Sequence, residues 1–425
     1  MKFRRLLLAG IMFYLFFCFK GVSAEATQTI TIESYRTQAQ SVDADGKSET
    51  VLFSKTDIEL YYYDLDGNKC LSKTIQTDDA GYIKNVSLEV PDSIHRNQLF
   101  FRYLLKNDRY GYLVNSSGSQ YGAITSIFIP GKKVVNTDTT REFPNAEVIT
   151  SAAKTWELYV SSLDEIFASV EYAEANTSFK MRDDFEFKPL FVQYQKDEKL
   201  GNSFNIAQKD IGLVSKGTPY ISINDADVST RLINLIHEWS HWAMYSALGK
   251  FDTGGGYYSG YYTDTDPRVS WKEGGALAQS NIVSTRYWDW AYKSYQFGRK
   301  RFDTSPQDNN VIGRSTLSTV NGVLVDIFDK DYTYKGLEGV NEEEFYDLAS
   351  DHSKLTTAFN TDRAIKDGRL ANGLLMIAMV NSEARLLSEY IQYLKSSGMV
   401  KNIEQFDAML SMNGIDTNGN YTLEK

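Results

Sequence analysis

Two histidines and a glutamate stand at a spacing that can support metal chemistry. The chain reads His-Glu-Trp-Ser-His at positions 237–241, within a run of helical apolar periodicity from 229 to 248. Positions four apart share one face of a helix, so the imidazoles of His237 and His241 can point at one divalent ion. Glu238 would lie near that ion without binding it, where it can take a proton from a metal-bound water. The spacing therefore predicts a zinc site with Glu238 as general base.

Chance and simple burial explain this pattern poorly. With four histidines in 425 residues, the five-residue pattern would arise by chance about twice in a thousand such chains. The surrounding helix is apolar around most of its girth, and unpaired buried imidazoles and carboxylates cost several kcal/mol. A bound cation would satisfy all three groups. Asp227 or Ser229 can cap the start of this helix, and Gly249 can end it.

A third protein ligand is expected, because catalytic zinc sites keep three protein ligands and one open position. Residue 247, six after His241, is alanine, and His352 is the one histidine that follows. A carboxylate is therefore expected, and Glu273, thirty-two residues after His241, begins another helical run. Asp264 and Asp266 are the alternatives, although they also suit a turn before the proline at 267.

Small residues follow this glutamate. Gly274, Gly275 and Ala276 are unfavourable in a helix unless another element must come close. We expect them to let the helix of Glu273 pack tightly on the histidine helix, which would bring the carboxylate to metal distance.

This arrangement resembles the gluzincins, zinc metallopeptidases that combine His-Glu-x-x-His with a glutamate from a following helix. In many members that glutamate precedes Gly and a small residue, as here, and the resemblance covers about residues 220–290. It implies that His237, His241 and Glu273 bind one zinc ion and that Glu238 is general base and later proton donor. It also implies a thermolysin-like catalytic domain, in which the strand 220–223 forms the edge along which a peptide aligns.

The sequence departs from some gluzincins at one position. Those members place an aspartate four residues after the ligand glutamate, where it accepts a hydrogen bond from a ligand histidine; here this residue is Leu277. Asp326, inside an apolar helical run, is the candidate replacement, and a solvent-facing carboxylate at a helix end is the alternative.

A donor for the developing oxyanion is also expected. Several side chains are eligible, and the sequence does not choose between them: Tyr257, Tyr258, Tyr261, Tyr262, Tyr332, Tyr334 and His352. Glycines 254–256 lie beside four of these tyrosines and form either a lid hinge or a surface loop.

The elements around this motif indicate two domains. Alternating apolar residues and frequent turn signals from 27 to about 135 predict an all-β sandwich, assigned to residues 25–135. The turn at 77–82 resembles those of transthyretin-like and carboxypeptidase-regulatory-like modules; its aspartates favour Asx turns over calcium sites. Residues 145–425 are predicted as an α+β, mainly helical, zincin-like domain. Its helices are expected at 145–175 and, as the longest, near 370–395 and 403–410, with strands at 190–194 and 219–223.

Composition and the N-terminus bound the setting. The net charge of −10 excludes a typical nucleic-acid binder, which needs clustered Lys and Arg. Residues 1–24 read as a secretory signal, with an uncleaved anchor as the alternative. Its removal would leave 41 basic against 55 acidic residues and a single cysteine, Cys70, so no intrachain disulfide is expected.

The sequence thus predicts an exported zinc metallopeptidase, with a protein or peptide as substrate. Two alternatives remain open at this stage: a surface-binding adhesin with a structural zinc, and a zinc hydrolase acting on a non-peptide amide. The substrate, the choice between endo- and exopeptidase action, the oligomeric state and the role of the N-terminal domain stay undetermined.

Overall fold

The chain folds into two compact units in the computed structural model. The structure describes residues 26–42, 48–129, 134–141, 146–196, 201–249, 265–287, 313–328, 368–401 and 403–423. The first unit comprises Met1–Leu104 and Gly122–Pro144, and the second comprises Leu105–Tyr121 and Asn145–Lys425. The predicted signal at 1–24 lies outside the described residues. Within the described ranges, no helix combines the length and the apolar character that a membrane span needs.

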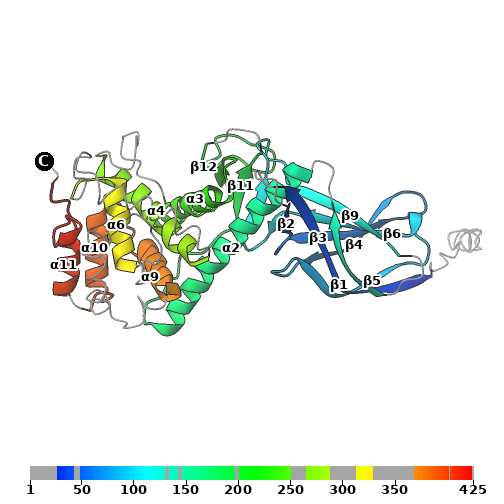
Figure 1. Cartoon of the computed structure of the whole chain (residues 1–425), viewed down its shortest axis with the longest axis horizontal. Helices are drawn as coiled ribbons and strands as arrows, with labels where there is room; N and C mark the ends of the chain where they lie inside the picture. The colour runs from blue at the N-terminus through cyan, green and yellow to red at the C-terminus, as the bar shows by residue number, and fades with distance from the viewer. Residues whose placement is uncertain are drawn as a thin grey trace, which may run out of the picture. The chain divides into compact units, whose positions relative to one another are not determined.

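Two four-stranded sheets form the first unit (Figure 1). The first sheet contains β1 (Thr27–Val42), β2 (Ser48–Leu52), β5 (Tyr82–Pro91) and β10 (Val134–Arg141). Strand β1 is long enough that β5 and β2 pair antiparallel with successive parts of one of its edges, while β10 pairs parallel with the other. The second sheet has the antiparallel order β4-β3-β6-β9. Its strands are β3 (Asp57–Tyr63), β4 (Lys69–Gln76), β6 (Gln98–Leu104) and β9 (Gly122–Phe128), and the 3₁₀ turn η1 (His95–Asn97) precedes β6.

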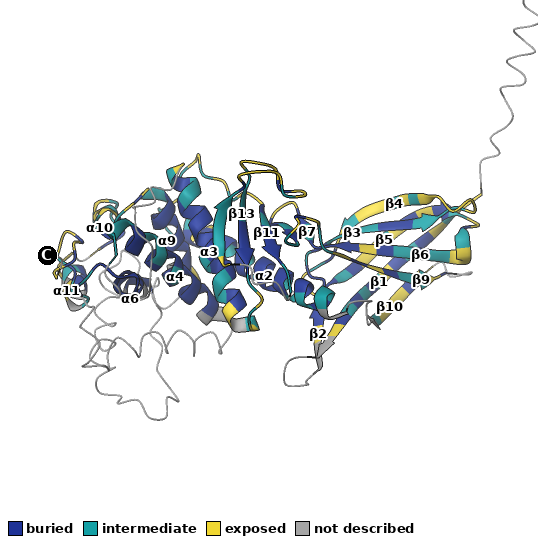
Figure 2. Ribbon diagram, turned by 90° about the horizontal axis from the view of Figure 1, so that it is seen from above, coloured by how far each residue is buried: buried dark blue, intermediate teal, exposed yellow. Residues whose placement is uncertain are grey.

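Aromatic side chains fill the space between these sheets. Tyr35 of β1 stacks on Phe101 of β6 with ring centroids 4.1 Å apart, and its hydroxyl shares a 3.1 Å hydrogen bond with Thr125 of β9. Phe53 and Tyr103 meet at 4.6 Å. Buried residues alternate with exposed ones along the strands (Figure 2). The predicted N-terminal β-sandwich is confirmed.

In the acidic turn at 77–82, the carboxylate of Asp78 bonds to backbone amides of the same turn. Asp78 Oδ1 accepts hydrogen bonds from the amides of Ala80 at 3.0 Å and Tyr82 at 2.8 Å, and Lys84 Nζ donates to Oδ2 at 2.6 Å. The carboxylate thus serves as the acceptor of an Asx turn, which is the role that the sequence favours over calcium binding.

A mixed five-stranded sheet in the order β12-β13-β11-β8-β7 anchors the second unit. Its strands are β7 (Lys106–Asn107), β8 (Gly111–Val114), β11 (Leu190–Tyr194), β12 (Ser203–Ile206) and β13 (Pro219–Ile223). Strands β8, β11 and β13 are parallel, whereas β7 and β12 are antiparallel edges. The strand at 219–223 is therefore interior, and its predicted position at the sheet edge is wrong, because β12 covers that side.

Two of these strands come from a segment inside the range predicted as sandwich. The backbone of Tyr110 accepts hydrogen bonds from the amide of Leu190 at 3.2 Å and from the hydroxyl of Tyr159 at 3.0 Å. Residues 105–121 therefore leave the first unit, complete the sheet of the second and return at Gly122.

Helices make up most of the remaining residues that the structure describes in the second unit. They are α2 (Ala146–Asn176), α3 (Val228–Leu248), α4 (Pro267–Tyr287), α6 (Leu317–Phe328), α9 (Gly368–Asn381), α10 (Leu387–Ser396) and α11 (Ile403–Met412). Helices α2 and α9 cross closely at Gly373, where a Cβ atom would lie 2.0 Å from the carbonyl oxygen of Ser169. The predicted order of an all-β region followed by an α+β, mainly helical region is confirmed.

The expectation for the longest helices is wrong. Helix α2 has 31 residues, whereas the range near 370–395 contains α9 and α10 with a break between them. At the break Glu383 has a left-handed φ of 49°, and the carbonyl of Ala384 accepts a 2.7 Å hydrogen bond from the Trp271 indole. That backbone geometry and that tertiary bond stop the helix, although the apolar pattern continues.

Candidate metal centre

Helix α3 presents both histidines because its two ends and its apolar side are fixed. Asp227 Oδ1 accepts the amide of Thr230 at 3.0 Å, and Gly249 ends the helix with a φ of 70°, so the predicted limits are confirmed. Trp239 packs on Phe187 with ring centroids 5.8 Å apart. The ring of Trp242 lies 6.3 Å from that of Phe185. These contacts set the rotation of α3.

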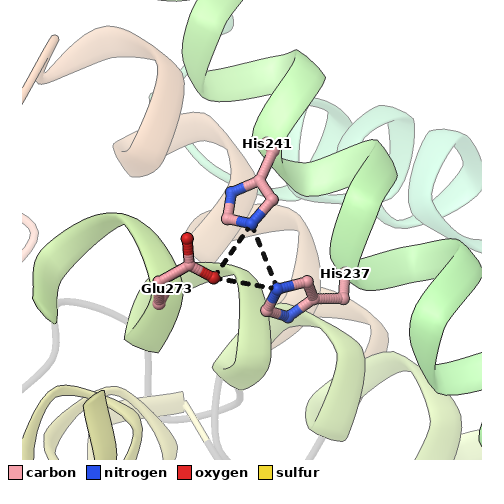
Figure 3. A group of neighbouring side chains, drawn as sticks. All are labelled: His237, His241 and Glu273. Atoms are coloured by element: carbon pink, nitrogen blue, oxygen red, sulfur yellow. Dashed lines mark hydrogen bonds and ion pairs between the residues drawn. The ribbon is translucent and has the colours of Figure 1, made fainter. Parts of the chain in front are cut away.

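Three side-chain atoms converge between α3 and α4 (Figure 3). The Nε2 atoms of His237 and His241 are 3.1 Å apart, and Glu273 Oε2 lies 3.2 Å from each. Exposure is low at all three side chains, at 18% for His237, 7% for His241 and 14% for Glu273. Two helices thus form a nearly equilateral triangle of donor atoms that is largely shielded from water.

The size of this triangle fits a tetrahedral metal ion. With zinc–ligand bonds of about 2.0–2.1 Å, neighbouring donor atoms of a tetrahedron lie roughly 3.3–3.4 Å apart. The observed separations of 3.1–3.2 Å are within a few tenths of an ångström of that edge length. Two imidazoles and one carboxylate are also donors that suit zinc.

Electrostatics in the cluster favour a cation. Burial alone would raise the pKa of Glu273, but the charge of His241 and hydrogen bonds from both histidines hold it well below its usual range. Burial alone would lower the pKa of His237, but the hydrogen bond with Glu273 and the negative charges of Glu238 and Glu273 raise it overall. The carboxylates therefore supply negative charge beside the imidazoles, and Glu238 itself is only 5% exposed.

The residues before Glu273 fix its helix. Trp271, 2% exposed, donates its indole N–H to Ala384 and packs on Tyr390 with ring centroids 4.9 Å apart. Lys272 Nζ contacts the other carboxylate oxygen, Glu273 Oε1, at 3.1 Å. Neither residue was singled out from the sequence; the available signals were a large aromatic and a cation directly preceding a proposed ligand.

The glycines after Glu273 act differently from the expectation. A Cβ at Gly274 would lie 2.5 Å from Val320 Cβ and 2.6 Å from the carbonyl oxygen of Leu317, so Gly274 allows α4 to approach α6. A Cβ at Gly275 would meet Met244 of α3, at 2.6 Å from its terminal methyl. The prediction that the small residues pack on the histidine helix therefore holds for Gly275 and is wrong for Gly274.

Other candidate residues do not join the cluster or lie outside the described part of the chain. Asp266 accepts the amide of Arg268 at 2.9 Å and pairs with its guanidinium, so its carboxylate serves the start of α4. Outside the described residues lie Asp264, the glycines at 254–256, Tyr257, Tyr258, Tyr261, Tyr262, Tyr332, Tyr334 and His352. Asp326 falls within α6, but its side chain is also outside the described set.

Comparisons with known proteins add no family. No protein-family model matches the chain, and no curated protein matches it. Among solved structures, the chain is similar to a 9R-lipoxygenase from Cyanothece PCC8801 at 10% identity and a TM-score of 0.18, over 88% of this chain and 67% of that chain. A likeness this weak carries no argument about fold or function, so function rests on the site.

Proposed function

We propose that this chain is a zinc metallopeptidase of the gluzincin type. The observation that carries the proposal is the triangle of His237, His241 and Glu273, with Glu238 next to the first histidine on the same helix. Within the described residues the metal-ligating group has three members. Structural zinc sites usually have four protein ligands, whereas catalytic sites have three and an open position for water.

The roles follow from the chemistry of each side chain. His237, His241 and Glu273 would hold the ion through the three atoms that converge. A bound Zn²⁺ would polarise a substrate carbonyl and lower the pKa of water to about 7. Glu238 accepts the proton of the attacking water and later donates it to the leaving amine. Because Glu238 is only 5% exposed, little bulk water competes for that proton.

Strand β12 is our candidate for aligning the substrate, in place of the interior β13. It is the antiparallel edge next to β13, and Phe204 on it contacts Tyr245 of α3 with ring centroids 5.4 Å apart. The edge therefore runs beside the helix that carries the histidines. An extended peptide that pairs with β12 would place its backbone along this side of α3.

Cleavage of a random peptide library, with and without a chelator, tests the proposal. We expect cleavage that the chelator abolishes and zinc restores. With a peptide from that profile, Glu238→Gln should retain zinc but lose about 10²–10⁴-fold in kcat/KM, the usual contribution of a general base. Glu171→Gln is the matched control, because Glu171 is an exposed residue of α2 with 71% of its side chain accessible.

The outcomes separate the alternatives. A protein that binds zinc but hydrolyses no peptide, and whose zinc binding and stability are unchanged in Glu238→Gln, would support a surface-binding protein with structural zinc. Hydrolysis of amides other than peptide bonds would support the second alternative. We also propose that the protein is exported, on the strength of residues 1–24; N-terminal sequencing of the protein recovered outside the cytoplasm would show whether this segment is removed.

A further inference from the structure

We propose that Lys272 is a positioning residue for the third ligand, holding one oxygen of Glu273 so that the other faces the histidines. This inference rests on the proposed metal site. The two oxygens of the Glu273 carboxylate have different partners. Oε1 lies 3.1 Å from Lys272 Nζ, and Oε2 lies 3.2 Å from the Nε2 atom of each imidazole.

The contact between Lys272 and Glu273 is not a default of helix geometry. Adjacent residues on a helix project about 100° apart and do not face each other, so the lysine side chain must turn toward its neighbour. Both side chains are mostly sheltered, with 26% of Lys272 and 14% of Glu273 exposed. An ion pair in such surroundings is screened less than a surface pair.

A ligand carboxylate needs this kind of restraint. It can rotate about its last bond and bind a metal through one oxygen or through both. Binding through Oε2 alone keeps a position open for water, whereas binding through both oxygens would occupy one more position of the ion. Partners that orient a ligand in this way typically contribute 10–100-fold to metal affinity.

The charge of Lys272 makes the test decisive, because it opposes the positioning effect. A cation close to a metal site repels the ion. If Lys272 acted by charge alone, its removal would tighten zinc binding. If it positions Glu273, its removal weakens zinc binding, so the direction of the change distinguishes the two roles.

The experiment compares zinc affinity in full-length variants by competition with a chelator. We expect Lys272→Met and Lys272→Gln to weaken zinc binding about 10–100-fold, and Lys272→Arg to bind close to wild type. Arg268→Met is the matched control, since it removes a cation from the first turn of α4, where Arg268 pairs with Asp266. Co²⁺ replaces zinc in a second measurement. The visible absorption band of bound Co²⁺ should weaken in Lys272→Met. A carboxylate bound through both oxygens raises the coordination number of the ion, and Co²⁺ with more ligands absorbs more weakly.

The melting temperature of each metal-free variant verifies folding, and Lys272→Gln serves if Lys272→Met unfolds. Unchanged or tighter zinc binding in folded Lys272→Met or Lys272→Gln, with an unaltered Co²⁺ spectrum, overturns the positioning role. If the wild type binds and hydrolyses normally in that case, the proposed function stands and this inference alone fails. If the wild type does not bind zinc, both the proposed function and this inference fail.

Discussion

Replacing Gly274 by alanine should disturb the metal centre through the contact between α4 and α6. The new Cβ would lie 2.6 Å from the carbonyl oxygen of Leu317 and 2.5 Å from Val320 Cβ. The carbonyl belongs to the backbone of α6, so rotation of a side chain cannot relieve the overlap. To restore an ordinary contact of 3.4 Å, α4 must retreat by about 0.8 Å.

The cost can be divided between folding and metal binding. Overpacking typically costs about 1–3 kcal/mol, and replacing glycine by alanine in a helix returns about 1 kcal/mol, so we expect a net loss of roughly 0–2 kcal/mol in unfolding free energy. Glu273, the neighbouring residue, moves with the helix. A shift of this size exceeds the tolerance of about 0.2 Å on metal–ligand distances. Zinc affinity should therefore fall at least about tenfold, or 1.4 kcal/mol.

Gly275→Ala is the matched control on the same helix turn. Its Cβ would meet the terminal methyl groups of Met244 at 2.6 Å and Met379 at 3.7 Å, and a methionine end can move aside. We expect unchanged or slightly higher stability and near wild-type zinc affinity, measured by chelator competition and thermal unfolding. Wild-type zinc binding in Gly274→Ala, or equal damage from Gly275→Ala, would refute the role assigned to the contact between α4 and α6.

Three further outcomes are expected. First, chelation should lower the melting temperature of the wild type but not of His237→Ala: zinc at 1,000 times its Kd adds about 4 kcal/mol, or on the order of 10 °C for a domain of this size. Second, Asp78→Asn should make the free energy of unfolding depend less on pH in the acid range, as measured by far-UV circular dichroism. Burial alone would raise the pKa of Asp78, but Lys84 and backbone amides lower it overall. The stability that ionised Asp78 adds is therefore fully present above the unfolded pKa of about 3.9 and is lost as pH falls through the pKa of the folded state. Because 39% of the Asp78 side chain is exposed, we expect this contribution to the free energy of unfolding to be no more than about 1 kcal/mol. If the wild type and Asp78→Asn lost stability equally as the pH falls, this prediction would be contradicted. Third, residues 145–425 expressed alone should aggregate or melt below the whole chain, because they lack β7 and β8; a soluble fragment of unchanged stability would show that these strands are dispensable.

The ligand cluster could be predicted because short-range geometry determines most of it. The helical repeat fixes the relation of His237 to His241 whatever surrounds them. Glu273 required a weaker inference, from a carboxylate followed by small residues at the start of a second helical run. Its contact with Lys272 could not be predicted, since adjacent residues on a helix have no fixed side-chain relation.

Packing partners and strand order were not accessible in the same way. Gly274 was expected to face α3, but the rotation of α4 directs it to α6, and α6 begins more than forty residues later in the chain. Likewise, β12 contributes only Ser-Phe-Asn-Ile, too short for a clear alternation. Without it the strand at 219–223 looks like an edge.

The excursion at 105–121 shows why a linear division into modules fails for this chain. Residues 110–114 have the strand character of their neighbours, and nothing local distinguishes pairing with β11 from pairing within the sandwich. The choice is made by contacts far away in sequence, since Tyr110 bonds to Leu190 and Tyr159. The parallel strands that precede α3 therefore depend on a segment inserted between β6 and β9. Any exchange of the first unit for another module must keep this segment, or the sheet that supports the histidine helix loses one side.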